Sequence, residues 1–561
     1  MKLRKMKKAL ALALAILLAL PLLASCASKG GAQTTEPPEI TGNPPPATRE
    51  PNSPNADDEA AAVKTEVTIG ISPPSNFDPL VAAGHGTYVK LIYSSLVEFD
   101  SDVNIVPDLA ESYSISDDAL TYTFKLRPDA KFSDGEPVKP SDVAFTYNTM
   151  QTKATQIDIT ALDTVTLDND NVVMKLKEPQ STFILSVAGI GIVPERSYGD
   201  DFQMNPIGSG PYKLVQYDVD QQMILEANEY YYGKEPKIKR AVFIKMSDDD
   251  TRLMAAKSGQ VDITITSSAL AEATTIDGYN LLVEKTVDNM GIVMPVIPAN
   301  SATSVNGNPM GNDIGCDQNL RKAIAYALDR QQLVNEGLNG YGTPAYSEND
   351  GMPWWNPESV IDADVDYAIQ LLEEAGWFDT DGDGIREKDG VKASVPLYYF
   401  AGDTARQAVS MSAAKQIKEK IGVELLVEGT NVTEELFVRE PIILAWGSAN
   451  PSTSYYLYHS SSVGKDDWYN PESFSNATID QYLDAAHSAR SLEESLELWK
   501  KAQWDGTTGT SMRGECPYIF LVNKDHLYFR RDGLNTGDQM IHAHGDAWPL
   551  VMNLRDWYWE S

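Results

Sequence analysis

The chain has 561 residues, of which 42% are apolar, and 80 acidic against 46 basic residues give it a formal net charge of −34. This length exceeds what one hydrophobic core can organise and predicts two or more domains. So negative a surface repels nucleic acid, and we expect no nucleic-acid partner.

The first residues have the pattern of an export signal. Five basic residues precede an uncharged apolar run from Ala9 to Ala24, and this run is shorter than the about 20 residues of a membrane span. Such a start predicts a secretory signal peptide over residues 1–25. The small residues directly before Cys26 resemble the lipobox of bacterial lipoproteins, in which that cysteine is lipidated. The alternative is a retained signal anchor, with Cys26 incidental.

Residues 26–63 are rich in proline and show almost no apolar periodicity. Such a segment buries too little apolar surface to offset its ordering entropy. We therefore expect a disordered linker that extends from a lipid-anchored Cys26 to the folded body.

The folded body alternates between strand and helix patterns. In its first half we expect strands over 67–71, 113–115, 120–126 and 172–176, and helices over 85–96 and 139–150. In its second half we expect helices over 319–338, 365–375 and 405–420, with strands over 395–400 and 422–427 beside the last. The mixture predicts an α/β protein without a regular βαβ or tandem repeat.

Catalytic and metal motifs are scarce. The chain has no Gly-x-Ser-x-Gly, no His-Glu-x-x-His and no phosphate-binding glycine loop, so we expect no enzyme and no cofactor. Asp379, Asp381 and Asp383 have the spacing of a calcium loop, but Gly390 stands where a bidentate glutamate belongs. They are a weak calcium candidate against a plain acidic turn. His542 and His544 are expected to be structural.

The two remaining cysteines, Cys316 and Cys516, are far apart in the sequence. Two such residues support neither a disulfide framework nor a zinc site. They form either one bridge or two buried thiols, and we favour the thiols.

A series of phrases along the chain resembles, in order, the bacterial extracellular solute-binding proteins of family 5, the peptide- and nickel-binding subunits of ABC importers. The phrases are Val106–Ser112 (VPDLAES), Tyr122–Pro128 (YTFKLRP), Lys131–Pro137 (KFSDGEP), Asn205–Tyr212 (NPIGSGPY), Tyr231–Gly233 (YYG), Ser258–Asp262 (SGQVD), Leu320–Arg330 (LRKAIAYALDR) and Leu371–Trp377 (LLEEAGW). Most of these residues serve structure: Gly135 and Gly210 suit turns or close backbone approach, and Asp108 and Asp142 suit helix caps.

The resemblance implies a two-lobed, periplasmic-binding-protein-like α/β fold of the cluster C type, with an extra subdomain in the first lobe. On this basis lobe I comprises residues 64–110, 200–295 and 522–561, its subdomain 111–199, and lobe II 296–521. Ligand binds between the lobes, and closure presents both lobes to the transporter.

In peptide-binding members of this family, an acidic residue shortly after a tryptophan-rich turn pairs with the peptide's amino terminus. The matching stretch here begins with Trp446, Gly447 and Ser448, but Ala449 or Asn450 stands where the acid belongs. This puts an amine clamp in doubt, since a buried ammonium without a carboxylate is costly. Further ligand-binding candidates are Tyr455, His85 and Tyr88.

The resemblance therefore predicts a monomeric substrate-binding subunit that captures an oligopeptide or similar-sized solute and delivers it to an ABC permease. It would stand on the outer face of the cytoplasmic membrane, held by a lipid anchor. One alternative keeps the fold and binds a metal chelate, an opine or a glycan fragment. The others are a lipid-anchored hydrolase and a peptide sensor.

Overall fold

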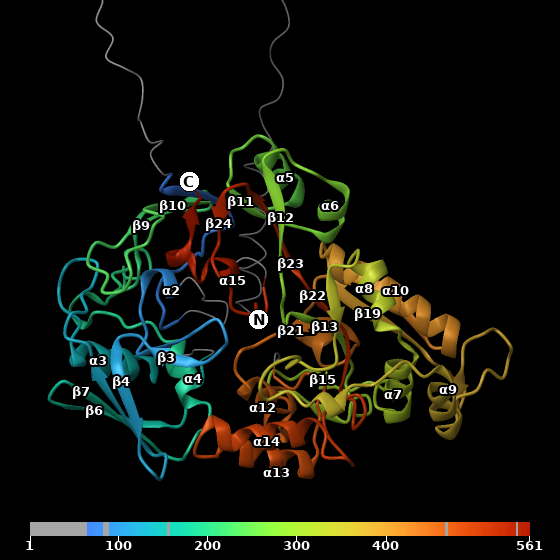
Figure 1. Cartoon of the computed structure of the whole chain (residues 1–561). Helices are drawn as coiled ribbons and strands as arrows, with labels where there is room; N and C mark the ends of the chain where they lie inside the picture. Colours follow the sequence, from blue (N-terminus) through green and yellow to red (C-terminus); the bar gives the residue numbers. More distant parts are fainter. Residues whose placement is uncertain (1–63, 82–88, 154–156, 466–468, 546–547, 561) are drawn as a thin grey trace, which may run out of the picture. The chain divides into compact units, whose positions relative to one another are not determined.

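The computed structural model describes residues 64–560, except 82–88, 154–156, 466–468 and 546–547 (Figure 1). The predicted signal peptide, the linker and Cys26 lie outside the described residues. Within this part of the chain, the larger sheets have seven, six and four strands.

The seven-stranded sheet is built from both ends of the folded chain. Its order is β12–β23–β11–β1–β10–β9–β8, in which β1 runs parallel to β10 and β11 and the other pairs are antiparallel. The strands are β1 (Glu66–Gly70), β8 (Tyr212–Asp218), β9 (Gln222–Ala227), β10 (Arg240–Ile244), β11 (Ile263–Thr266), β12 (Tyr279–Glu284) and β23 (His526–Arg531). Its helices are α2 (Val89–Ile92), α5 (Asp249–Lys257), α6 (Ser268–Ala273) and α15 (Trp548–Val551).

The predicted helix over 85–96 is shorter than expected. Within the described residues α2 ends at Ile92, where the N–H of Gly210 donates a hydrogen bond to the Ile92 carbonyl at 2.9 Å. A Cβ at Gly210 would lie 2.7 Å from that carbonyl carbon, so the close backbone approach predicted for this glycine is confirmed.

The four-stranded antiparallel sheet lies almost wholly within residues 111–199, the range expected for the subdomain. Its order is β4 (Ala110–Ile115), β5 (Thr121–Leu126), β7 (Asn171–Leu176) and β6 (Leu162–Asp168). Tyr122, Phe124 and Leu126 alternate into its core while Lys125 faces water, as the period-two pattern predicts. Helices α3 (Pro140–Met150) and α4 (Phe183–Ala188) belong to the same region.

Several of the phrases named above meet where this subdomain joins the first lobe. The Asp108 carboxylate accepts the N–H of Ser95 at 3.0 Å and the hydroxyl of Tyr232, and the Arg127 guanidinium lies 4.0 Å from the centre of the Tyr232 ring. Asp108 precedes β4, so its assignment as a helix cap is wrong. Asp142 does act at a helix start: it accepts the N–H of Lys139 at 2.9 Å.

The six-stranded sheet forms the second lobe. Its order is β16 (Gly342–Pro344), β22 (Tyr518–Lys524), β13 (Asn289–Val293), β21 (Ile442–Trp446), β19 (Ser394–Phe400) and β20 (Glu424–Thr430). Around it lie α7 (Gln318–Ala327), α8 (Arg330–Gly337), α9 (Val365–Glu374), α10 (Thr404–Ile421), α11 (Glu434–Phe437), α12 (Ser452–Tyr458), α13 (Ala477–His487) and α14 (Leu492–Gln503).

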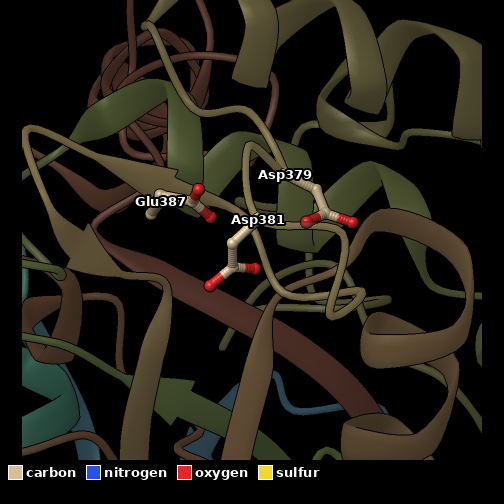
Figure 2. A group of neighbouring side chains, drawn as sticks. All are labelled: Asp379, Asp381 and Glu387. Carbon is tan, nitrogen blue, oxygen red and sulfur yellow. The ribbon is translucent and has the colours of Figure 1, made fainter.

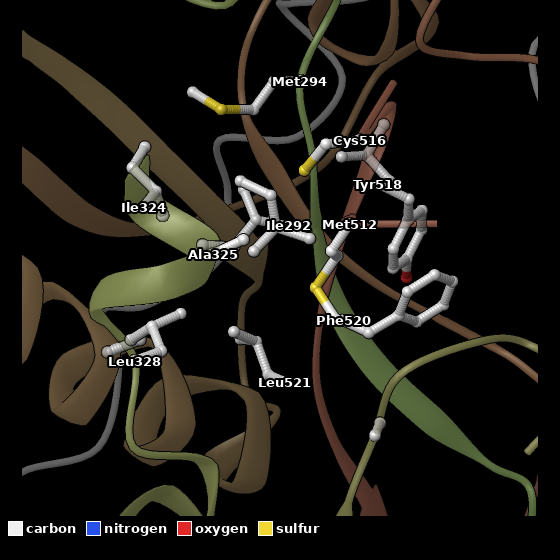
Figure 3. Packing of buried hydrophobic residues seen from close by; sticks show 14 of the residues in the cluster. Ile292, Met294, Ile324, Ala325, Leu328, Met512, Cys516, Tyr518, Phe520 and Leu521 are labelled. Atoms are coloured by element: carbon white, nitrogen blue, oxygen red, sulfur yellow. The ribbon is translucent and has the colours of Figure 1, made fainter. Parts of the chain in front are cut away.

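Side chains from β13, β22 and α7 form much of the core of this lobe. Ile292, Ile324 and Leu521 are completely buried, and Figure 3 shows them packing with Leu328 and Met512. Cys516 is buried there as a free thiol, and burial raises its pKa to about 11. Cys316 is also free but only half-buried, so the two form no bridge.

The predicted helix over 319–338 is two helices. The chain leaves the helical conformation at Leu328, and the Asp329 carboxylate then caps α8 by accepting the N–H of Gln332 at 2.9 Å. An aspartate inside an apolar-periodic run can therefore mark a new N-terminus.

Short pairings and turns complete the described chain. The pairs are β2 (Val97–Phe99) with β3 (Ile105–Pro107), β14 (Ala302–Thr303) with β15 (Pro309–Met310), β17 (Glu387–Lys388) with β18 (Val391–Lys392), and β24 (Leu534–Asn535) with β25 (Tyr558–Trp559). The 3-10 turns are η1 (Glu195–Ser197), η2 (Pro357–Ser359), η3 (Ser460–Ser462) and η4 (Leu554–Asp556).

The backbone passes from one large sheet to the other at 285–288, between β12 and β13, and again at Asp525, between β22 and β23 (Figure 1). We call these segments the crossings. Strand pairing places β13 in the second sheet, whereas the predicted division put residues up to 295 in the first lobe. The other lobe boundaries remain predictions.

Candidate ligand-binding site

The loop after β21 lies against the crossings. The Gly447 carbonyl accepts the N–H of His544 at 3.3 Å, and a Cβ at Gly447 would lie 2.7 Å from the carbonyl oxygen of Val287. Val287 belongs to the first crossing. Trp446 and Gly447, predicted from the sequence to bind ligand, therefore lie where the two sheets meet, and the tight contact requires glycine at 447.

Ser448 and Asn450 hold the shape of the same loop. The Ser448 hydroxyl accepts the N–H of Asn450 at 3.1 Å. The Asn450 side-chain oxygen accepts both the N–H and the hydroxyl of Ser452, at 3.0 and 2.8 Å, at the start of α12. This oxygen is the neutral acceptor that could have served a ligand amine, and it is already engaged.

Tyr455 lies in an aromatic stack between α12 and α13. Its ring is stacked on His459 at 4.5 Å and lies 4.8 Å from His487, and its hydroxyl donates to Asp484 at 3.2 Å. His487 also lies 3.7 Å from the carboxylate of Asp158, which belongs to the subdomain region.

The end of α13 contacts that region directly. The N–H of Ser181 donates to the His487 carbonyl at 2.8 Å, and the Ser181 hydroxyl donates to the Ala486 carbonyl at 2.7 Å. Burial opposes ionisation of Asp158, but hydrogen bonds led by that from His487 outweigh it and hold the pKa of Asp158 below its ordinary value. Tyr455 therefore lies beside a contact between α13 and the region of Asp158 and Ser181.

A buried ionic cluster connects the two crossings. Asp288 is fully buried, and its carboxylate lies 3.0 Å from His526 Nε2 and 2.6 Å from His544 Nδ1. His526 Nδ1 lies 3.0 Å from His542 Nδ1, and Lys524 lies 3.4 Å from Asp288. Burial opposes the charge, but Lys524 and His544 together keep the pKa of Asp288 well below its usual range. His542 and His544 are thus structural, as predicted.

Residues 104–468 match the family model described as "Bacterial extracellular solute-binding proteins, family 5 Middle". The chain belongs to this family. The match covers more than half of the chain and includes the Trp446 loop.

Curated relatives extend the similarity beyond that region. Protein XP55 of Streptomyces lividans is 31% identical over 494 residues, covering 84% of this chain and 86% of that protein. The oligopeptide-binding protein AppA of Bacillus subtilis is 28% identical over 426 residues, covering 71% of this chain and 76% of that protein.

Solved structures share the two-lobed fold. NikZ from Campylobacter jejuni in complex with Ni(L-His) aligns with a TM-score of 0.75 at 22% identity, over 88% of this chain and 99% of that one. AppA from Bacillus subtilis in complex with a nonapeptide aligns with a TM-score of 0.69 at 22% identity, over 88% of this chain and 99% of that one. At these identities the structures establish the fold of this family 5 protein, which is the fold class predicted.

The second lobe of this family 5 protein also contains buried acids that sequence reasoning missed. Glu472 is completely buried, and neither of its carboxylate oxygens has a hydrogen-bond partner among the described residues. Glu348, also buried, accepts from Ser454, Asn349 and Tyr458, and burial raises its pKa. Asp350 accepts from Tyr346 and Asn523, and burial raises its pKa to about 7. Nothing in their spacing marks these acids before the chain folds.

The acidic loop of the calcium candidate lies on the surface. Asp379 and Asp381 come together with Glu387 within 4.8 Å, as Figure 2 shows, whereas Asp383 pairs with Lys392. Lys392 also lies 3.0 Å from Asp381, so this cation already neutralises part of the loop. The weak calcium candidate of Asp379, Asp381 and Asp383 stays a prediction.

Two predicted ligand residues, His85 and Tyr88, lie outside the described residues, as does Cys26. In the described parts of the chain, no helix combines the length and apolarity that a membrane crossing requires.

Proposed function

We propose that this chain is the extracytoplasmic substrate-binding subunit of an ABC importer, and that it captures an oligopeptide or a solute of similar size between its lobes. The observation that carries the proposal is the position of the Trp446 loop. Gly447 contacts the first crossing and the His544 backbone, so a ligand bound on this loop would touch both lobes and stabilise the closed state.

Peptide is the favoured ligand for two reasons. The relative AppA is named an oligopeptide-binding protein, and a structure of AppA contains a nonapeptide. Trp446 has a half-buried aromatic side chain, which suits ligand side chains of varied kind. Other structural neighbours hold Ni(L-His) or agropinic acid, so a metal chelate or an opine is the second candidate class.

The remaining parts of the proposal concern the setting. A lipid on Cys26 and the linker over 26–63 would tether the binding body to the outer face of the cytoplasmic membrane, beside an ABC permease. The body acts as a monomer and performs no catalysis, since the partner complex supplies the energy of transport.

The ligand class can be tested by mass spectrometry of the solutes that denaturation releases from the purified chain. We expect peptides several residues long, and we expect Trp446→Ala to lose them. Release of a metal chelate or an opine would favour the second ligand class. Turnover of a bound solute during incubation would instead support the alternative function of a hydrolase. Replacing Cys26 with Ser should release the protein from the membrane fraction; unchanged membrane association would contradict the lipid anchor.

A further inference from the structure

Three of the six histidines of the chain gather at the crossings, where the two large sheets are joined (Figure 1). His526 begins β23, directly after the second crossing. The carbonyl of His542 accepts the N–H of Val287, in the first crossing, at 2.9 Å. Two residues further on, His544 donates its N–H to the Gly447 carbonyl at 3.3 Å. This short segment therefore links the first crossing to the loop after β21.

The hydrogen bonds of the cluster indicate where its ring protons lie. Although burial opposes the charge, Lys524 and His544 hold the pKa of Asp288 well below its usual range, so this carboxylate is ionised and accepts. It lies 3.0 Å from His526 Nε2, and this nitrogen therefore carries a proton. The other nitrogen of the same ring, Nδ1, lies 3.0 Å from His542 Nδ1. A hydrogen bond between two such nitrogens needs one proton, which either ring can hold.

This bond limits the number of protons that the two rings can hold together. They have four ring nitrogens, and the shared bond allows at most three of them a proton. A fourth proton would set two N–H groups against each other and bring two positive rings into contact. Both side chains are almost completely buried, at 1% exposure each, so water screens that repulsion poorly. The pair is therefore intact only while one of its two histidines is neutral.

The surrounding charges add no spare carboxylate for a doubly protonated pair. The other titratable groups that face the cluster are two carboxylates, two ammonium groups, a third imidazole and two phenols: Asp288, Asp525, Lys524, Lys285, His544, Tyr518 and Tyr528. Lys524 lies 3.4 Å from Asp288, and Lys285 lies 2.7 Å from Asp525. Asp546 lies outside the described residues. Each proton added to an imidazole therefore gives a positive charge in excess of the described carboxylates.

The sign of the pH dependence follows from this limit. Histidine gains its proton within roughly pH 5 to 8. Two rings that have moved apart into water can both become protonated in that range, whereas the assembled pair holds one proton fewer. The separated arrangement binds more protons, so a fall in pH favours separation.

Resting on the proposed function, we propose that His526 and His542 form an acid-sensitive latch at the crossings. At neutral pH the latch holds the segment 542–544 between the first crossing and the Trp446 loop. As the pH falls it separates, and the binding site releases its solute. Capture of the solute is accordingly regulated by the pH of the medium.

The first measurement is made on the full mature chain without solute. The N–H of Val287 donates to the His542 carbonyl, so hydrogen exchange at this amide reports whether the segment is in place. We expect its protection factor, corrected for the intrinsic pH dependence of exchange, to fall about tenfold or more between pH 7.5 and pH 5. Val242 of β10 is the control, because it pairs within the first sheet and should keep its protection unless the whole chain unfolds.

His542→Gln is the decisive variant. Its amide can donate to His526 Nδ1 when that nitrogen is bare, and its oxygen can accept when that nitrogen is protonated, so the bond persists at every pH. His487→Gln is the matched control, because it removes a histidine of α13, outside the crossings.

The second measurement is equilibrium dialysis of a randomised pentapeptide pool at the same two pH values. We expect retention to fall about tenfold or more at pH 5 in the parent chain and in His487→Gln, and less than about threefold in His542→Gln. The latch is overturned if the protection of Val287 in the parent chain does not change with pH, or if His542→Gln shows the full fall in protection. A chain that retains no peptide at either pH contradicts the proposed ligand class, and the exchange of Val287 then decides the latch by itself.

Discussion

Glu472 makes the stability of this protein depend on pH in a way that one substitution should remove. Its side chain is fully buried and both oxygens lack hydrogen-bond partners within the described residues. The turn around it has positive φ angles at Asn470 (48°) and Ser473 (60°). Burial, assisted by the neighbouring Glu348, raises the pKa of Glu472 to about 8 from an ordinary 4.5.

The size of the effect follows from linkage. The unfolded chain releases this proton at lower pH than the folded chain, so folding stability falls as the pH rises above 4.5 and levels off above 8. At 1.36 kcal/mol for each unit, the full cost is about 5 kcal/mol, and most of it is incurred between pH 5 and pH 8. Glu472→Gln carries no proton to lose and escapes this cost.

Urea unfolding at pH 5 and pH 8, followed by tryptophan fluorescence, measures the difference. We expect the two proteins to differ by less than about 1 kcal/mol at pH 5, and the Gln variant to be more stable at pH 8 by about 3 to 4 kcal/mol. Glu374→Gln, on the exposed face of α9, should follow the parent chain at both values. Parallel pH profiles of the parent and Glu472→Gln would refute the assignment of a buried, unpartnered acid.

Two further predictions concern the binding apparatus. Gly447→Ala should weaken peptide retention in equilibrium dialysis at least tenfold, because its Cβ would lie 2.7 Å from the Val287 oxygen. Gly199→Ala is the control and should leave retention unchanged, because no atom lies within 4 Å of its Cβ. Equal retention by both variants would contradict the contact at Gly447. Asp158→Asn should weaken the contact to α13 by about 1 to 3 kcal/mol, seen as faster amide exchange at Ser181, and unchanged protection there would contradict it.

Patterns that depend on one element and one buried face could be predicted from the sequence. The strand with Tyr122, Phe124 and Leu126 was identified because the alternation of burial is local. Helices α9 and α10 lie within a residue of their predicted bounds, because apolar periodicity and an aspartate cap mark each start. The break between α7 and α8 was not predicted, since apolar residues continue through it and Asp329 resembles a surface position.

The candidate site was predictable only in part. Trp446 and Gly447 could be predicted as ligand-binding residues because the resemblance to the family extends over the whole loop after β21. The buried Asp350 could not, because it and its partner Asn523 lie far apart in the sequence and meet only in the folded chain. Likewise Glu472 is an ordinary acid until α12 and the 346–356 segment bury it. Contacts between distant strands, and pKa shifts caused by burial, leave no local sequence pattern from which they could be predicted.

The central claim is that a solute bound at the boundary of the two sheets closes the lobes around it. Small-angle X-ray scattering of the chain, first stripped of solute by denaturation and refolding and then loaded with a randomised pentapeptide pool, tests this most directly. The account predicts a smaller radius of gyration after loading in the parent chain and none of that change in Trp446→Ala. Saturating peptide with no change in the radius of gyration of the parent chain would contradict it.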